Sequence, residues 1–279
     1  MQFAINVPNF GAFGDARTLS DLAHEAESCG WDGFFIWDHI YFKEEMGELP
    51  MADPWVSLGA IAMATERIRF GALVTPLPRR RPWKVAREAV TVDRLSGGRL
   101  ILGAGIGWNH WGEYTRFGEE DGEKLHAEQL DEALAILVGL WSGEPFSFTG
   151  KHYRIEESRF LPIPAQQPRI PIWLAAGYPN QRPLRRAAHW DGVCPISREK
   201  ITPAHVREMM EVISRERVSQ DPFDIVLAGY TGNMEPDEAA ALLSGLSAAG
   251  ATWWQEGFWG TDTVDDAHKR IQQGPPHLS

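Results

Sequence analysis

The stretch FFIWDHI, residues 34–40, places an aspartate and a histidine directly after a run of large apolar residues. The run follows Asp32-Gly33 and is rich in aromatic residues, which predicts a buried strand that ends near Asp38 and His39. α/β enzymes keep their catalytic groups at the carboxyl ends of such strands. A histidine there can act as a general acid or base, with the aspartate in a supporting role. The pair could equally serve structure, as a hydrogen-bonded core histidine and an ion-pair partner.

Two further loops carry groups that could bind an anion. In LAAGYPNQRPLRR, residues 174–186, a strand that ends at Gly177 precedes a helix start at Pro183, and free amides at a helix start bind phosphate. In TPLPRRRPW, residues 75–83, prolines stiffen a loop that holds Arg79, Arg80 and Arg81. Rigid like charges could meet the anionic tail of a ligand, although exposed charges often have no measurable effect.

The tryptophans are unusually numerous, 12 in the chain, and several lie beside polar residues at expected strand ends. A set of indole rings on one rim would suit a flat aromatic ligand, because the rings give large contact area at low entropic cost. The tryptophans in question are Trp37, Trp108, Trp111, Trp253, Trp254 and Trp259.

Apolar strand-like runs alternate with helical patterns along the chain and give eight strand-helix units. The expected strands are residues 3–7, 34–39, 68–74, 100–107, 170–176, 191–196, 223–229 and 251–258, and the longest expected helix is residues 123–141. Residues 144–169 contain four prolines and interrupt the alternation, which predicts an irregular excursion.

This order of elements predicts an α/β fold built on one parallel sheet, because parallel strands need helical crossovers. Eight units in about 250 residues close into a (β/α)8 TIM barrel, so we expect a single domain over residues 1–279. An open doubly wound sheet is the alternative, with GAGIGW as its nucleotide fingerprint. That fingerprint fails because Trp108 stands where the third glycine is needed.

Composition excludes several classes of function. The 27 lysines and arginines against 38 aspartates and glutamates give a formal charge of −11, which argues against a nucleic-acid partner. No apolar run of about 18 residues predicts a membrane span, and the amino end carries no signal-peptide pattern, so we expect a cytoplasmic protein. Cys29 and Cys194 are expected as buried apolar residues, and no metal site is expected.

Three segments together resemble the luciferase-like monooxygenase family, whose members use FMN or the deazaflavin coenzyme F420. The segments are CGWDGFFIWDH, RIRFGALVTPLPRRRPWKVAREAVTVDRLSGGRLILGAGIGW and PIWLAAGYPNQRPLRRAAHWDG. The resemblance covers nearly the whole chain, and VDRLSGGRL is its most specific part. It implies a (β/α)8 barrel with the flavin lying across the carboxyl ends of the strands.

The resemblance also implies roles for single residues. His39 matches a histidine over the flavin ring, and Asp38 beside it looks like the F420 branch. Ala72-Leu73 falls where the family carries a non-proline cis peptide beneath the ring, and Gly177 with Tyr178 matches the phosphate loop. Cofactor contacts are also expected at neighbouring positions of the same face: Gly105, Gly107, Trp108, Ala176 and Asn180. In two places the chain departs from relatives, because Trp108 replaces a glutamate of several F420 dehydrogenases and Ile106 a phosphate-binding arginine of bacterial luciferase.

The favoured function is hydride transfer between F420 and a small organic substrate. The alternatives are an FMN-dependent monooxygenase that uses reduced flavin and O2, and a flavin-binding relative without turnover. A metal-dependent barrel hydrolase is disfavoured, because the chain has no H-x-H or H-E-x-x-H motif. The expected partner is a small-molecule substrate, and a homodimer is left open.

Overall fold

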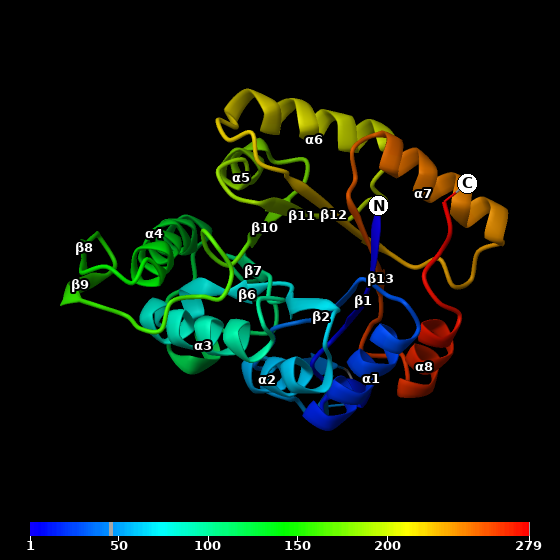
Figure 1. Ribbon diagram of the computed structural model, residues 1–279, viewed down its shortest axis with the longest axis horizontal. Coiled ribbons are helices and arrows are strands. Elements are labelled where there is room, and N and C mark those ends of the chain that lie inside the picture. Colours follow the sequence, from blue (N-terminus) through cyan, green and yellow to red (C-terminus); the bar gives the residue numbers. More distant parts are fainter. Residues whose placement is uncertain (45–46, 279) are drawn as a thin grey trace.

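The computed structural model describes residues 1–44 and 47–278. Within these residues, nine strands form one parallel sheet that curls into a nearly closed barrel, and helices surround it (Figure 1). In chain order the strands are β1 (Gln2–Val7), β2 (Gly33–Ile36), β5 (Arg69–Ala72), β6 (Thr75–Pro76), β7 (Leu102–Gly105), β10 (Ile172–Gly177), β11 (Gly192–Ile196), β12 (Asp224–Gly229) and β13 (Trp253–Gly257). In the sheet their order is β5-β2-β1-β13-β12-β11-β10-β7-β6. The predicted barrel is confirmed.

Helices follow the strands as the sequence pattern predicts. They are α1 (Ala16–Ser28), α2 (Pro54–Ala64), α3 (Pro82–Leu95), α4 (Glu123–Trp141), α5 (Gln181–Ala187), α6 (Pro203–Glu216), α7 (Pro236–Ala248) and α8 (Val264–Gln272), with single 3-10 turns at Gly11–Phe13, Leu77–Arg79 and Thr115–Phe117. Side chains cap several of them; the Asp53 carboxylate, for example, accepts from the Val56 amide at 2.9 Å. Helix α5 starts two residues before Pro183, because Asn180 caps it. Across residues 1–44 and 47–278, no helix combines the length and apolar character that crossing a bilayer requires.

Glycines let the barrel close between β5 and β7. The Ile101 amide donates to the Phe70 carbonyl at 2.9 Å, and an isolated parallel bridge pairs Phe70 with Leu100. A Cβ atom on Gly71 would lie 2.0 Å from the Ile101 carbonyl oxygen, and one on Gly103 would lie 2.3 Å from that of Ala72. Only glycine permits so close a backbone approach, which explains part of the glycine-rich sequence of β7.

The barrel interior is filled by side chains and is not a pore. A compact cluster occupies its centre, formed by Ala4, Phe35, Ile101, Trp173, Val226 and Trp253. Trp253 and Trp254 are therefore core residues, 2% and 5% exposed, and do not belong to the rim where the sequence interpretation placed them. A second, larger apolar core lies between the strands and the surrounding helices.

Two short antiparallel hairpins lie outside the barrel. The first consists of β3 (Lys43–Glu44) and β4 (Gly47–Glu48). The second, β8 (Phe146–Thr149) with β9 (Arg154–Ser158), accounts for the excursion expected over residues 144–169 and lies beside α4 at the left edge of Figure 1. Glu132 of α4 holds this hairpin, because its carboxylate accepts from the amide of Tyr153 at 2.9 Å.

The non-proline cis peptide is present one bond later than expected. It joins Leu73 to Val74, so the prediction of a cis bond at Ala72-Leu73 was wrong by one residue. The Leu73 amide still donates to the Ile36 carbonyl at 2.8 Å, which extends the pairing of β2 with β5. The Ala72-Leu73 peptide therefore keeps the trans geometry of a strand, and the chain departs from it only afterwards.

Candidate functional site

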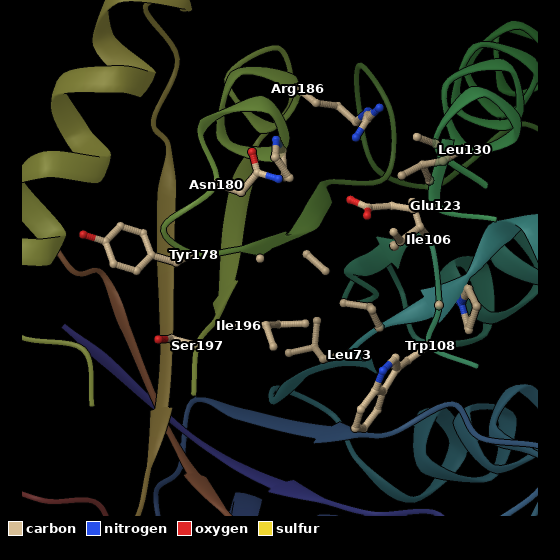
Figure 2. A pocket seen from close by; sticks show the side chains of 18 of the residues that line it. Leu73, Ile106, Trp108, Glu123, Leu130, Tyr178, Asn180, Arg186, Ile196 and Ser197 are labelled. Atoms are coloured by element: carbon tan, nitrogen blue, oxygen red, sulfur yellow. The ribbon is translucent and has the colours of Figure 1, made fainter. Parts of the chain in front are cut away.

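A cavity of about 1240 Å³ opens at the carboxyl ends of the barrel strands. Its floor is apolar and comes from the ends of β5, β7, β10 and β11, while α4, α5 and the loops around them form one wall. Figure 2 shows Asn180 and Arg186 above the cavity and Trp108 below it, with Leu73 and Ile196 between them. The volume exceeds the roughly 300–1,000 Å³ of pockets for drug-sized ligands, so the cavity suits a larger molecule.

Most residues expected at the cofactor site line this cavity. The lining includes Asp38, His39, Leu73, Gly105, Gly107, Trp108, Gly177, Tyr178 and Asn180. Ala72 and Ala176 belong instead to the core between strands and helices, 2% and 0% exposed. Successive strand residues point to opposite faces of a sheet, so their neighbours Leu73 and Ala175 reach the cavity in their place.

His39 lies on a loop, not on the strand itself. Strand β2 ends at Ile36, so the expectation that it would continue through His39 was wrong. Asn9, fully buried after β1, holds the His39 backbone on both sides. The His39 amide donates to Asn9 Oδ1 at 3.1 Å, and Asn9 Nδ2 donates to the His39 carbonyl at 2.8 Å. The side-chain amide of Asn9 thus accepts one hydrogen bond and donates the other, and together they fix the backbone position of His39.

The imidazole of His39 is oriented by Glu113. His39 Nδ1 lies 2.9 Å from Glu113 Oε2, and the two side chains are 18% and 2% exposed. Burial opposes ionisation of Glu113, but the hydrogen bond from His39, the charge of Arg79 and the Ile40 amide outweigh it and lower the pKa of Glu113. An ionised carboxylate only accepts hydrogen bonds. Nδ1 therefore donates the hydrogen of this contact, and Nε2 is the ring nitrogen that the contact leaves free.

Asp38 pairs with arginines and does not reach a ligand through a free carboxylate. It is 3% exposed, and its Oδ1 accepts from Arg79 at 2.9 Å and from Arg80 at 2.8 Å. Arg79 also donates to Glu113 Oε1 at 2.8 Å and so links the two carboxylates. The side chains of Arg79 and Arg80, 5% and 16% exposed, are thus used inside the protein. Neither Arg79 nor Arg80 is among the residues that line the cavity, and Arg81 is exposed at the start of α3.

One wall of the cavity is rich in basic side chains. The lysines and arginines that line the cavity within the described chain come from α4, α5 and the segment after β11: Lys124, Arg182, Arg186 and Arg198. Glu123 and Glu199 also lie there, and Arg186 is paired with Asp131 at 2.6 Å. The formal charge of this wall remains positive, because four basic side chains stand against two glutamates, although the whole chain carries a charge of −11.

The Tyr178 hydroxyl donates to Glu208 at 2.5 Å, and this hydrogen bond raises the pKa of Tyr178 to about 12.

Sequence reasoning missed Glu113, Asn9 and the internal role of Arg79. Glu113 is 74 residues from His39 in the chain and lies in an irregular loop after β7, where periodicity carries no information. A usable signal did exist for the carboxylate, because the resemblance left Trp108 where relatives have a glutamate. Glu113 supplies a carboxylate five residues further on.

Among the described residues, no group of three or more histidine, cysteine, aspartate or glutamate side chains is arranged to hold a metal ion.

Solved structures share this fold. The coenzyme F420-dependent tetrahydromethanopterin reductase of Methanopyrus kandleri superposes with a TM-score of 0.77 at 17% identity and covers 100% of this chain and 99% of that one. An F420-dependent secondary alcohol dehydrogenase, solved with an F420-acetone adduct, superposes with a TM-score of 0.81 at 15% identity and 99% and 98% coverage. At these identities the likeness concerns the fold alone.

Sequence comparison finds nearer relatives. The F420-dependent glucose-6-phosphate dehydrogenase of Nakamurella multipartita is 32% identical over 171 residues, which cover 58% of this chain and 47% of that protein. The enzyme of the same name from Beutenbergia cavernae is 28% identical over 221 residues, 78% of this chain and 64% of that protein. The match thus spans between about half and just under two thirds of these relatives. Residues 1–266 match the family described as luciferase-like monooxygenase. With its closed parallel barrel and its cavity at the strand ends, the chain belongs to the luciferase-like monooxygenase family.

Proposed function

We propose that this protein is an F420-dependent oxidoreductase that moves a hydride between the deazaflavin and a small organic substrate. The observation that carries the proposal is the chain of contacts from His39 through Glu113 to Arg79 at the edge of the cavity. These contacts would orient the His39 imidazole so that it can exchange a proton with a substrate bound in the cavity. The names of the sequence relatives support F420 as the cofactor.

The residues of the cavity fit such a cofactor. The apolar floor, with Leu73, Ile106 and Ile196, would hold a flat ring. A Cβ atom added at Gly177 would meet nothing within 4 Å, so space is left beside the end of β10. Arg182 and Arg198 would bind the phosphate and the acidic tail, since guanidinium groups match such anions well.

Bound F420 would supply a ring carbon that accepts or releases a hydride. His39 Nε2 would take the proton that leaves the substrate, and ionised Glu113 would stabilise the imidazolium that forms. Arg79 would keep Glu113 ionised. Asp38 would hold Arg79 and Arg80 in place, a positioning role. Aromatic side chains around His39 would limit the access of water.

Titration of the purified protein with F420 and with FMN in parallel tests the proposal. We expect F420 to bind more tightly, and its bound form to be reduced in a single turnover by a suitable alcohol. Tighter binding of FMN, with consumption of O2 and oxygenation of a substrate by the reduced complex, would support the monooxygenase alternative instead. Binding of F420 without turnover by any candidate substrate would point to the non-catalytic relative.

A further inference from the structure

Two amide side chains lie inside the barrel, near its mouth. Asn6 is on β1 and Gln255 is on β13, and these strands pair in parallel. Side chains alternate along a strand, and Ala4 and Trp253, two residues earlier on each strand, belong to the cluster at the barrel centre. Asn6 and Gln255 therefore point into the barrel, one layer nearer the carboxyl ends of the strands. They are in contact there, because Asn6 Nδ2 donates to Gln255 Oε1 at 2.6 Å.

We call Asn6 and Gln255 the amide pair. Within the described part of the chain, Asn6 Oδ1, an acceptor, and Gln255 Nε2, a donor, have no hydrogen-bond partner, and the two residues are 7% and 2% exposed. Turning both amide groups by 180° reverses the hydrogen bond between them but again leaves one donor and one acceptor. A buried polar group without a partner destabilises the fold until water or a ligand satisfies it.

The barrel mouth is open beside the amide pair. Ala228 of β12 is the register partner of Gln255, and it faces inward because it alternates with Val226 of the central cluster, yet it is exposed. On β13 the next inward position is Gly257, where an added Cβ atom would meet only the Gly229 carbonyl oxygen, at 3.6 Å. Neither strand therefore places a large side chain over Gln255.

This side of the mouth adjoins the cavity at Trp37. The Trp37 amide donates to the Val7 carbonyl at 3.0 Å, which places Trp37 beside the end of β1, and Trp37 also lines the cavity. The cavity floor comes from β5, β7, β10 and β11, and the amide pair is not part of its lining. A cofactor in the cavity would therefore leave the side of the mouth over β1, β13 and β12 to another molecule.

The chemistry of the amide pair selects the group that it would bind. The pair offers one donor and one acceptor on two different side chains, so it matches a group that carries an acceptor and a donor on two different atoms. A carboxylate has acceptors only, and it would leave the acceptor of the pair without a partner beside a negative charge. The C=O and N–H along one edge of a carboxamide or lactam satisfy both atoms at once.

We propose that the amide pair recognises the amide edge of an uncharged substrate, a primary carboxamide or a lactam. This inference rests on the proposed function, because it takes the molecule bound here to be the substrate of that reaction. Water can satisfy the two atoms in the free protein, and the amide edge would displace it. The substrate would place its polar edge on the pair and its body toward Trp37 and the cavity.

The test compares the binding of two small lactams to the full chain by ligand-observed NMR. 2-Piperidone presents the complete amide edge, whereas N-methyl-2-piperidone keeps the carbonyl and lacks the N–H. We expect the wild type to bind 2-piperidone about 3- to 10-fold more tightly, the effect of one net hydrogen bond. The protein loaded with F420 should keep this preference, because the amide pair lies outside the cavity.

Two variants locate the preference for 2-piperidone. The double variant Asn6→Leu/Gln255→Met replaces both amides by apolar side chains of similar size, a change that can be nearly neutral for stability. Ala228→Leu fills the open mouth beside Gln255 and leaves both amides in place. Both variants should lose the preference, with Tm and the F420 dissociation constant near the wild-type values. Gln273→Met, at an exposed glutamine after α8, is the control and should keep the preference.

The outcomes separate this inference from the function on which it rests. Equal affinity of the two lactams for the wild type overturns the inference, as does a preference that survives in the double variant. Should the double variant not fold, a preference that survives in Ala228→Leu overturns it. Loss of the preference on loading with F420 would show that the cofactor covers the amide pair, and would overturn the substrate assignment. Failure of F420 to bind overturns the proposed function, whereas the lactam measurements on the free protein still decide whether the pair binds an amide edge.

Discussion

At the scale of single residues, the site depends on a balance of buried charges. Asp38 and Glu113 supply two carboxylates and Arg79 and Arg80 two guanidiniums, so the group is neutral before His39 is counted. A buried charge is tolerated when it is paired and hydrogen-bonded, and removing one partner leaves the other stranded. Each member therefore matters to stability as well as to the orientation of the imidazole.

Glu113→Gln tests this balance through pH. The pKa of Glu113 is lowered from its ordinary value of 4.5, so its ionised form stabilises the fold above that pH, and the contribution is lost as pH falls through the lowered pKa. We expect the variant to lose about 1–3 kcal/mol of unfolding free energy at pH 7. The deficit should shrink in acid, where wild-type Glu113 is protonated too.

Denaturant unfolding across pH 3 to 7 gives the measurement. Glu211→Gln, at a 70% exposed residue of α6, is the control and should change stability by no more than a few tenths of a kcal/mol. A Glu113→Gln deficit that is constant with pH would contradict the account of its ionisation.

At the scale of elements, the sequence predicted the strands and helices well because each strand is a distinct apolar run between polar turns. It missed β6, since two residues carry no periodicity, and it described β8 with β9 only as an irregular excursion. The strand pattern did place His39 and Gly177 near strand ends, and both line the cavity. The site was not predictable for Glu113 or for Arg79, because their partners are set by loop geometry between distant segments.

Gly103→Ala tests the close approach of β5 and β7. The added methyl would lie 2.3 Å from the Ala72 carbonyl oxygen, so a strand must shift. We expect a loss of about 1–3 kcal/mol in unfolding free energy, measured by denaturant titration. Gly245→Ala in α7 is the control, because its nearest neighbour is Pro203 Cγ at 3.5 Å and alanine favours a helix. Equal stability of the Gly103 variant and wild type would refute the role assigned to this glycine.

At the scale of the whole molecule, helix α2 leaves apolar side chains exposed on its outer face. Its sequence, PWVSLGAIAMA, contains no charged residue, and Val56 and Met63, two turns apart, are each 70% exposed. A helix that is apolar all round is normally buried. We propose that a second copy of the chain covers this face by a self-complementary contact about a two-fold axis.

We therefore expect a homodimer by light scattering, and a monomer for the double variant Val56→Asp/Met63→Asp with little change in Tm. Val218→Asp, at an 86% exposed valine after α6, is the control and should leave the dimer intact. A monomeric wild type at micromolar concentration would exclude this association.

The measurement that tests the central claim most directly is made on His39→Ala. If His39 exchanges the proton of the reaction, the variant should lower the single-turnover rate of cofactor reduction by about 10²- to 10⁴-fold. Its F420 dissociation constant should stay near the wild-type value, because the basic wall is untouched. His189→Ala, at an exposed histidine after α5, should change neither quantity. A His39 variant with reduced Tm but an unchanged rate per folded molecule would show that the imidazole serves only the structure, and would contradict the account.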